Sequence, residues 1–258
     1  MILSLDRDLD SFFSWLDKNV GLDNVWLALT ADHGIGPIPG EAAKLGMNSA
    51  AVNTDAVYAT VNEQLDQRYS RGEKVDYLLP GPDLPYVVLD ERAFKMAGVD
   101  EKTAEELVAG LLQEAVTSQA PKPDGDFPVQ QRLPPTPHAI TYTHLELANG
   151  PLPPTKWGGL LAHSYADHGN WFVMLILDAY QSDEPSAFAG TNHFTPWSYD
   201  RHVPLAFYGA PFLAGEYHEQ VEPVDLAVTF ASLAGVNLPS AAVGRVLIEA
   251  LKPVRAAG

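Results

Sequence analysis

The sequence predicts an α/β fold, in which a sheet is flanked by helices. Segments with apolar residues at helical spacing alternate with short apolar runs, and this alternation favours the α/β class. Several of these runs lack an apolar/polar alternation of their own, which is typical of strands buried on both faces. The chain has 258 residues, of which 46% are hydrophobic and 19% charged. That is enough for a sizeable core, and we expect one domain over residues 1–258.

The first predicted elements are a helix and a strand. The helix carries five apolar residues at helical spacing: Leu5, Leu9, Phe12, Phe13 and Leu16. Ser4 is its expected N-cap, and Gly21 follows its end. Residues 25–30 then form an apolar run without alternation, which predicts a buried strand of a parallel sheet.

The middle of the chain repeats the pattern. A second helix is marked by Val57, Val61 and Leu65, and residues 86–89 read as a strand. A third helix contains Leu107, Leu111 and Leu112, and the box Thr103-x-x-Glu106 is its expected start. The acidic residues around position 105 indicate a solvated helix start.

Residues 121–154 interrupt this order. They contain nine prolines and no periodicity, so we expect an irregular, Pro-rich insertion there. Strands are predicted again over residues 171–177 and 203–209. A last helix is predicted from about Pro223 to Gly235.

Charge and composition limit the function classes. The formal charge of −17 repels phosphate backbones at long range, which argues against nucleic acid as a partner. Cysteine is absent, so a metal site has to use His, Asp or Glu. No apolar run approaches the ~20 residues of a membrane span, and the N-terminal residues lack the basic start and apolar centre of a signal peptide.

Asp32, His33 and Gly34 follow the predicted strand at 25–30 directly. Ligands collect at the carboxyl ends of strands in open α/β sheets, and a carboxylate with a neutral imidazole is an ordinary pair of zinc ligands. An Asx-type turn with a solvent-exposed histidine fits the same three residues equally well. The motif alone therefore leaves both readings open.

A second group of motifs favours the metal-ligand interpretation. The chain contains Thr30-Ala31-Asp32-His33-Gly34, then Gly-Thr-x-His ending at His193, then Ser-Tyr-Asp-x-x-Val-Pro-Leu-x-Phe-Tyr-Gly over residues 198–209. A tail follows, with Asp225, Thr229, Leu233, Gly235-Val236, Pro239 and Gly244. In order and spacing this sequence resembles the alkaline phosphatase superfamily, most closely the zinc-dependent alkaline phosphatases related to type I phosphodiesterases and nucleotide pyrophosphatases.

The resemblance implies an alkaline-phosphatase-like sheet flanked by helices and a two-zinc hydrolase of phosphate esters. By position, Asp32 and His33 would bind the zinc ion that activates the nucleophile, and His193 the ion on the leaving-group side. Asp200 would act from the second shell, by a hydrogen bond that orients a ligand histidine. The family usually has glycine after the motif histidine, and Phe194 in its place would narrow the site mouth.

Part of the family pattern has no match in this chain. The family's first strand with an Asp ligand, its nucleophile and its Asp-x-x-x-His pair all precede the helix that opens this sequence. We therefore expect a truncated, C-terminal portion of the fold, incomplete at the N-terminal side, with the nucleophile outside the chain. The isolated chain is expected to be inactive, and an exposed apolar surface would need a complementing N-terminal segment or self-association.

The resemblance leaves three functions open. The first is hydrolysis of phosphate monoesters by the complete fold, with a small phosphate ester as substrate. The alternatives are a phosphodiesterase or nucleotide pyrophosphatase of the same fold, and a non-catalytic fragment or interaction module. Family resemblance implies a periplasmic or secreted protein.

Other histidines receive no ligand role. Asp167-His168-Gly169-Asn170 repeats the first motif, but it precedes a strand, so a hairpin turn between residues 159–165 and 171–177 is favoured. His138, His144 and His163 are expected to be surface or packing residues, and His202 to pack or lie outside the ligand shell. Five aromatic residues on apolar faces are expected in the core: Phe12, Phe13, Trp26, Trp171 and Phe172.

Overall fold

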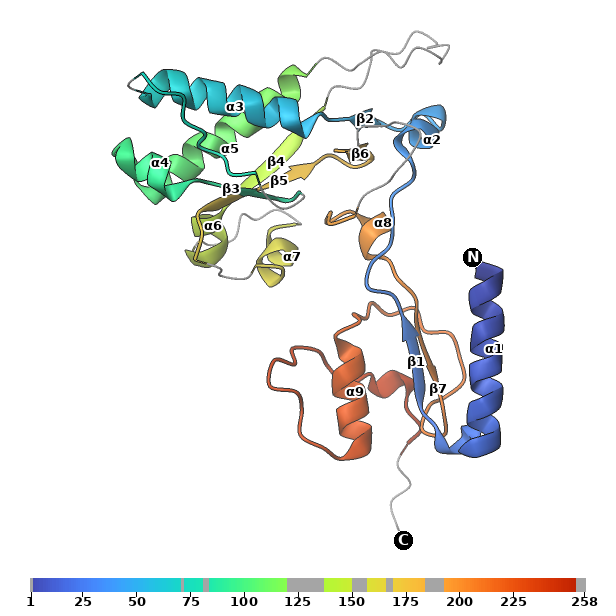
Figure 1. Cartoon of the computed structure of the whole chain (residues 1–258). Coiled ribbons are helices and arrows are strands. Elements are labelled where there is room, and N and C mark those ends of the chain that lie inside the picture. The colour runs from blue at the N-terminus through green and yellow to red at the C-terminus, as the bar shows by residue number, and fades with distance from the viewer. Residues whose placement is uncertain are drawn as a thin grey trace. The chain divides into compact units, whose positions relative to one another are not determined.

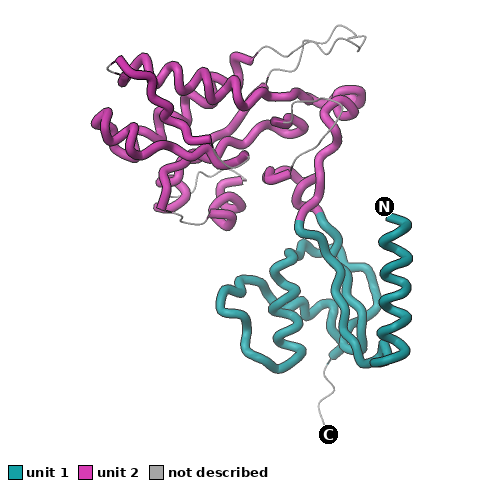
Figure 2. The backbone as a smooth tube through the Cα atoms, viewed as in Figure 1, with its two compact units in different colours: residues 1–32, 203–258 teal, residues 33–202 magenta. Residues whose placement is uncertain are grey.

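The structure is a computed structural model that describes residues 2–70, 72–80, 84–119, 137–149, 157–165, 169–183 and 193–253. Its contacts divide the chain into two compact units (Figure 2). One unit combines Met1–Asp32 with Val203–Gly258, and the other is His33–His202. The single domain expected from the sequence stays a prediction.

The first unit contains a pair of strands. β1 (Leu27–Thr30) lies antiparallel to β7 (Leu205–Tyr208), with Leu27 opposite Tyr208 (Figure 1). The strand predicted at 25–30 is confirmed, but its parallel, fully buried setting is wrong. Among the described residues β7 is the strand that pairs with β1, so outward side chains meet solvent and Leu29 is 62% exposed.

The first helix forms as predicted, but none of its side chains is buried. α1 (Ile2–Asn19) begins before Ser4, and Gly21 follows its end with a φ of 81°. None of the residues of α1 is buried, and Phe12 is 50% exposed. The expected core positions of Phe12, Phe13 and Trp26 are therefore wrong, because the described residues supply too little surface to cover these rings.

The tail motif holds the C-terminal segment in place. α9 (Asp225–Ala234) ends at Gly235, whose φ of 64° is the left-handed conformation that glycine adopts without strain. The buried carboxylate of Asp225 accepts hydrogen bonds from the N–H groups of Glu222 and Arg245. The Thr229 hydroxyl accepts one from Leu247, beside the 3₁₀ helix η2 (Ile248–Ala250). A second 3₁₀ helix, η1 (Leu22–Asn24), follows α1.

The second unit is built on a three-stranded antiparallel sheet. Its order is β3 (Tyr86–Val88), β5 (Phe172–Leu177) and β4 (Ala139–Thr143). All six residues of β5 are buried. This confirms the strands predicted at 86–89 and 171–177.

Alternate side chains of β5 enter two separate apolar clusters. Val173, Leu175 and Leu177 pack in the larger cluster, whereas Phe172, Met174 and Ile176 pack in the smaller one. A strand points successive side chains to opposite faces, so β5 divides the core of this unit. Helices α3 (Thr54–Tyr69) and α5 (Glu101–Ser118) pack on the face of the larger cluster, and α6 (His144–Asn149) and α7 (Gly158–His163) on the face of the smaller one (Figure 1).

The helices that face the larger cluster start at side-chain caps. The carboxylate of Asp100 accepts a hydrogen bond from the N–H of Thr103, so α5 begins two residues before the predicted box. The box is therefore wrong, since Asp100 takes the capping position first. Asn53 caps α3 in the same way, and Val57, Val61 and Leu65 of α3 are buried as predicted.

Two expectations for the following stretch are wrong. Within the insertion expected to be irregular, residues 139–149 form β4 and α6, because β4 finds its ladder partner in β5. The expected hairpin does not form either, since residues 158–163 are helical and β5 pairs with β3 and β4. Residues 121–136 and 150–154 of the predicted insertion lie outside the described residues.

Short elements complete the second unit. These are α2 (Pro39–Lys44), α4 (Glu91–Met96), α8 (Ser198–Arg201) and the parallel pair β2 (Ala50–Ala51) and β6 (Gln181–Ser182). Throughout the described ranges, none of the helices is both long and apolar enough to cross a membrane.

Candidate metal centre

The structure brings together two of the three predicted metal ligands. The imidazole rings of His33 and His193 are stacked, with centroids 3.8 Å apart and an angle of 13° between the ring planes. Both rings are half-buried. Asp32 directly precedes His33 and is exposed.

The local bonding of His33 fixes which ring nitrogen carries a lone pair. Nδ1 lies 2.6 Å from the carbonyl oxygen of Gly34. A carbonyl can only accept, so Nδ1 carries the proton, and the lone pair of the neutral ring is on Nε2. His33 is therefore held in the tautomer that offers Nε2 to a cation.

Gly34 ties the first motif to the segment that follows His193. Its N–H donates a 2.7 Å hydrogen bond to the carbonyl of Asp200 in α8. A Cβ atom at position 34 would lie 2.0 Å from the carbonyl oxygen of Tyr199. The glycine of the Asp-His-Gly motif is thus needed because the backbone of α8 occupies the place of a side chain.

Asp200 acts on the loop that carries His193. It is 4% exposed, and its Oδ2 accepts hydrogen bonds from both the N–H and the hydroxyl of Thr195. Its Oδ1 is buried without a hydrogen-bond partner within the described part of the chain. The predicted bond from Asp200 to a ligand histidine stays a prediction, while the bonds that are seen fix the backbone two residues after His193.

Phe194 adopts a backbone conformation that favours glycine. Its φ is 75°, a backbone conformation that is strained for residues with a Cβ atom. Its ring is stacked on His193, with centroids 3.9 Å apart, and is 54% exposed. A residue expected to narrow the site mouth therefore lies against a predicted ligand.

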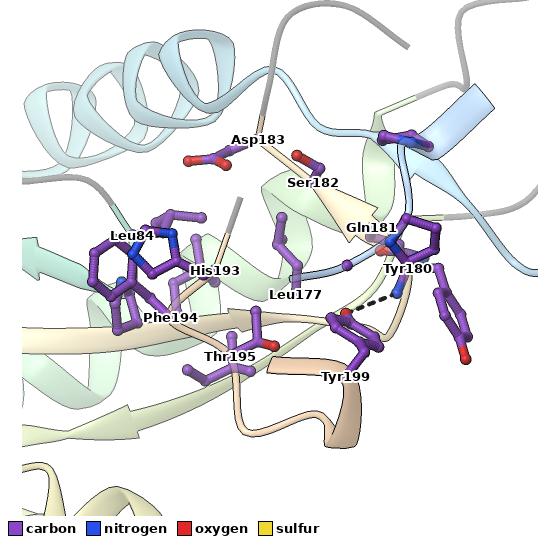
Figure 3. A pocket seen from close by; sticks show the side chains of 16 residues that line it. Leu84, Leu177, Tyr180, Gln181, Ser182, Asp183, His193, Phe194, Thr195 and Tyr199 are labelled. Atoms are coloured by element: carbon purple, nitrogen blue, oxygen red, sulfur yellow. Dashed lines mark hydrogen bonds between the residues drawn. The ribbon is translucent and has the colours of Figure 1, made fainter. Parts of the chain in front are cut away.

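A pocket lies next to His193 within the second unit. Figure 3 shows side chains that line it, among them Leu177, Tyr180, His193, Phe194, Thr195 and Tyr199. The Tyr199 hydroxyl accepts a hydrogen bond from the N–H of Tyr180, whose φ is 67°. Burial raises the pKa of the Tyr199 hydroxyl. Two strained non-glycine residues thus line one pocket, an arrangement typical of functional sites.

A second cluster of metal-ligating side chains was missed by the sequence reasoning. Glu101, Glu105 and His144 each place a ligand atom within 4.8 Å of the others. Glu105 is 0% exposed, so its expected place on a solvated helix start is wrong. Burial raises its pKa to about 7, against the lowering effect of its hydrogen bonds and of His144. The signal was available, because Glu105 shares the helical stripe of Val108 and Leu112.

The remaining histidines differ in setting. His138 is exposed and lies 3.3 Å from the carboxylate of Asp178, and His163 is the last residue of α7. His202 is exposed. Asp167 and His168 of the repeated motif lie outside the described residues.

Comparison with known proteins agrees with the predicted resemblance. The chain is 26% identical over 250 residues to a protein named calcium-transporting ATPase from Myroides odoratus, covering 97% of this chain and 41% of that protein. It is 25% identical over 253 residues to alkaline phosphatase PhoV from Synechococcus elongatus, covering 97% of this chain and 40% of that protein. No family model matches the chain.

The crystal structure of alkaline phosphatase PafA has the same fold. It superposes with a TM-score of 0.75 and 23% identity, covering 97% of this chain and 43% of PafA. PafA from Elizabethkingia meningoseptica is also 25% identical in sequence over 251 residues. The chain spans about two fifths of the length of these relatives, which fits the predicted match to a C-terminal portion. In sequence and fold, the chain is therefore similar to proteins of the alkaline phosphatase superfamily, as the motifs predicted.

Proposed function

We propose that this chain supplies part of the metal site of a two-zinc phosphate monoester hydrolase. The stacked pair of His33 and His193 is the observation that carries the proposal. Two-metal hydrolytic sites hold their ions about 3.5–4 Å apart, and parallel imidazoles separated by 3.8 Å could each offer a nitrogen to one ion. The relatives named alkaline phosphatase support the same chemistry.

The donor set fits zinc. A carboxylate from Asp32 and the Nε2 lone pair of His33 would hold the ion on the nucleophile side, and His193 the ion on the leaving-group side. Zinc, when bound, stabilises the negative charge that develops on the phosphoryl oxygens. Asp200 accepts the hydrogen bond of the Thr195 N–H and so keeps the segment next to His193 in place.

Phosphodiester or nucleotide pyrophosphate hydrolysis is the alternative reaction of this fold. The zinc-loaded complete protein is therefore assayed with p-nitrophenyl phosphate and with bis(p-nitrophenyl) phosphate. Chelator-sensitive turnover of the monoester above that of the diester supports our proposal, and the reverse preference supports the alternative. Activity from the chain alone would also correct the expectation that its nucleophile is supplied from outside.

Binding of inorganic phosphate tests the site when turnover is absent. Calorimetric titration of the zinc-loaded chain should show phosphate binding that needs zinc and disappears in His33→Ala/His193→Ala. His202→Ala is the matched control, because it removes an exposed histidine of the same unit. Equal phosphate binding by the original chain and by His33→Ala/His193→Ala would favour a non-catalytic fragment. The absence of phosphate binding from the original chain would favour the same conclusion.

Association through α1 is a second candidate, favoured by one observation. Ile2, Leu3 and Trp15 of α1 are 79%, 73% and 57% exposed. Apolar surface of this extent favours contact with a complementing segment or a second copy. Sedimentation should therefore show self-association that Trp15→Gln weakens, and a monomer at all concentrations would contradict it.

The resemblance also implies a place in the cell. We propose that the complete protein is exported to the periplasm or the medium. Fractionation of cells that produce it checks this proposal, and recovery in the cytoplasmic fraction alone would contradict it.

A further inference from the structure

The cluster of Glu101, Glu105 and His144 lies at the junction of two helices of the second unit. Glu101 and Glu105 are one turn apart on α5, so their side chains share a face. His144 is the first residue of α6. The side chains are 29%, 0% and 12% exposed, respectively.

The distances within the cluster suit a metal ion. Nδ1 of His144 lies 2.9 Å from Oε1 of Glu101 and 3.6 Å from Oε1 of Glu105. In tetrahedral zinc sites with bonds of 2.0–2.1 Å, neighbouring donor atoms are about 3.4 Å apart. The two observed separations lie on either side of that value.

The groups around the cluster already orient its side chains. Nε2 of His144 lies 2.9 Å from the hydroxyl of Tyr165. Ligand histidines commonly use their second ring nitrogen in this way. The carboxylate of Glu105 accepts hydrogen bonds from the N–H groups of Leu145, at 3.1 Å, and Phe172, at 3.4 Å.

The charge balance also favours a cation. Two carboxylates face one imidazole, and the ion pairs seen for Glu101 and Glu105 within the described ranges are those with His144. The nearby Lys102 is paired with Glu106 on the exposed side of α5. A buried carboxylate is stable as an anion when it is paired or binds a metal.

We propose that Glu101, Glu105 and His144 bind one divalent transition-metal ion, of which zinc suits a His/Glu/Glu set. The ion would fasten the first turn of α5 to the start of α6. Glu101, the most exposed of the three, lies on the entry side. This site shares no ligand with the predicted pair His33 and His193.

The experiment isolates this site from the other. The metal-free chain carrying His33→Ala/His193→Ala is titrated with ZnCl2 in a calorimeter. We expect about one equivalent of zinc to bind, and Glu101→Gln in that background to weaken binding by at least about tenfold. Glu106→Gln is the matched control, since it removes the same charge from the exposed face of α5, and it should change affinity less than about twofold.

A second measurement guards against loss of folding. Circular dichroism checks each variant, and His144→Gln replaces Glu101→Gln if the latter unfolds. Cobalt(II) gives an independent signal, because a visible ligand-field band should appear in the background chain and in Glu106→Gln and be lost in Glu101→Gln. Failure of the background chain to bind zinc, or equal weakening by Glu101→Gln and Glu106→Gln, overturns the proposal. Neither result bears on His33 and His193.

Discussion

The ring of His33 lies flat against the ring of His193, although 160 positions separate them in the sequence. Hydrogen bonds of the neighbouring residues hold the two rings next to each other. Gly34 donates its N–H to Asp200, and Asp200 holds Thr195 with its side chain. The two sequence motifs are thus connected through α8.

Removing one ring should impair zinc binding at the proposed centre. We expect His193→Ala to weaken zinc affinity by at least about tenfold, because a ligand contributes more than the groups that orient it. The measurement is a zinc titration in the Glu101→Gln background, which removes the second candidate site. His202→Ala should leave the affinity within about twofold, and an equal loss in both variants would argue that His193 is not a ligand.

A methyl group at position 34 should disrupt the same contact. We expect Gly34→Ala to lower the free energy of unfolding by about 2 kcal/mol or more, because its Cβ would lie 2.0 Å from the carbonyl oxygen of Tyr199. Gly110→Ala in α5 is the control, since a Cβ there meets nothing within 4 Å. That change should stabilise the chain by about 0.5–1 kcal/mol in urea unfolding. A Gly34→Ala chain as stable as the original would show that α8 can move aside.

The strain at Phe194 can be measured with two substitutions. Both Phe194→Gly and Phe194→Ala remove the ring, but only glycine relieves a φ of 75°. We therefore expect the glycine variant to be more stable than the alanine variant by about 1 kcal/mol in thermal or urea unfolding. Equal stabilities would mean that the backbone at this position is relaxed in solution.

Glu105 should make the stability of the metal-free chain depend on pH. Burial raises its pKa from 4.5 to about 7, so the folded state holds a proton that the unfolded state loses. Protonated Glu105 therefore stabilises the folded state. This stabilisation is fully present below about pH 4.5, falls as the pH rises, and is lost above about pH 7. The difference amounts to about 3 kcal/mol.

Urea unfolding in the presence of chelator at several pH values checks this prediction. Glu105→Gln should flatten the stability profile between about pH 4.5 and 7, and Glu106→Gln should not. A profile that is unchanged in Glu105→Gln would show that another group titrates in this range.

Local sequence patterns predicted where helices and strands form, but they predicted less well how far each element is buried. The spacing of Val57, Val61 and Leu65 gave α3, and the apolar run at 171–177 gave the fully buried β5. The run at 25–30 is also mostly apolar, yet β1 is only partly covered. A run of apolar residues indicates that burial is favourable. Whether the strand is buried depends on which other parts of the fold pack against it.

The candidate site shows the same division. Sequence motifs named His33 and His193, and the structure stacks their rings. The contribution of Thr195 was not readable, because its bonds to Asp200 depend on how the chain turns between them. Glu105 was assigned to solvent because a charged residue near a helix start is usually exposed, and the partner that accompanies its burial, His144, is 39 positions away.

The pairing of Leu27 with Tyr208 has a consequence for synthesis of the chain on the ribosome. β1 is made first, but its ladder partner follows 181 positions later, after the whole of the second unit. At 5–20 residues per second this delay is about 9 to 36 seconds. Throughout that interval β1 lacks the backbone hydrogen bonds that β7 provides in the folded unit, and an unpaired strand of this kind is a natural target for a chaperone.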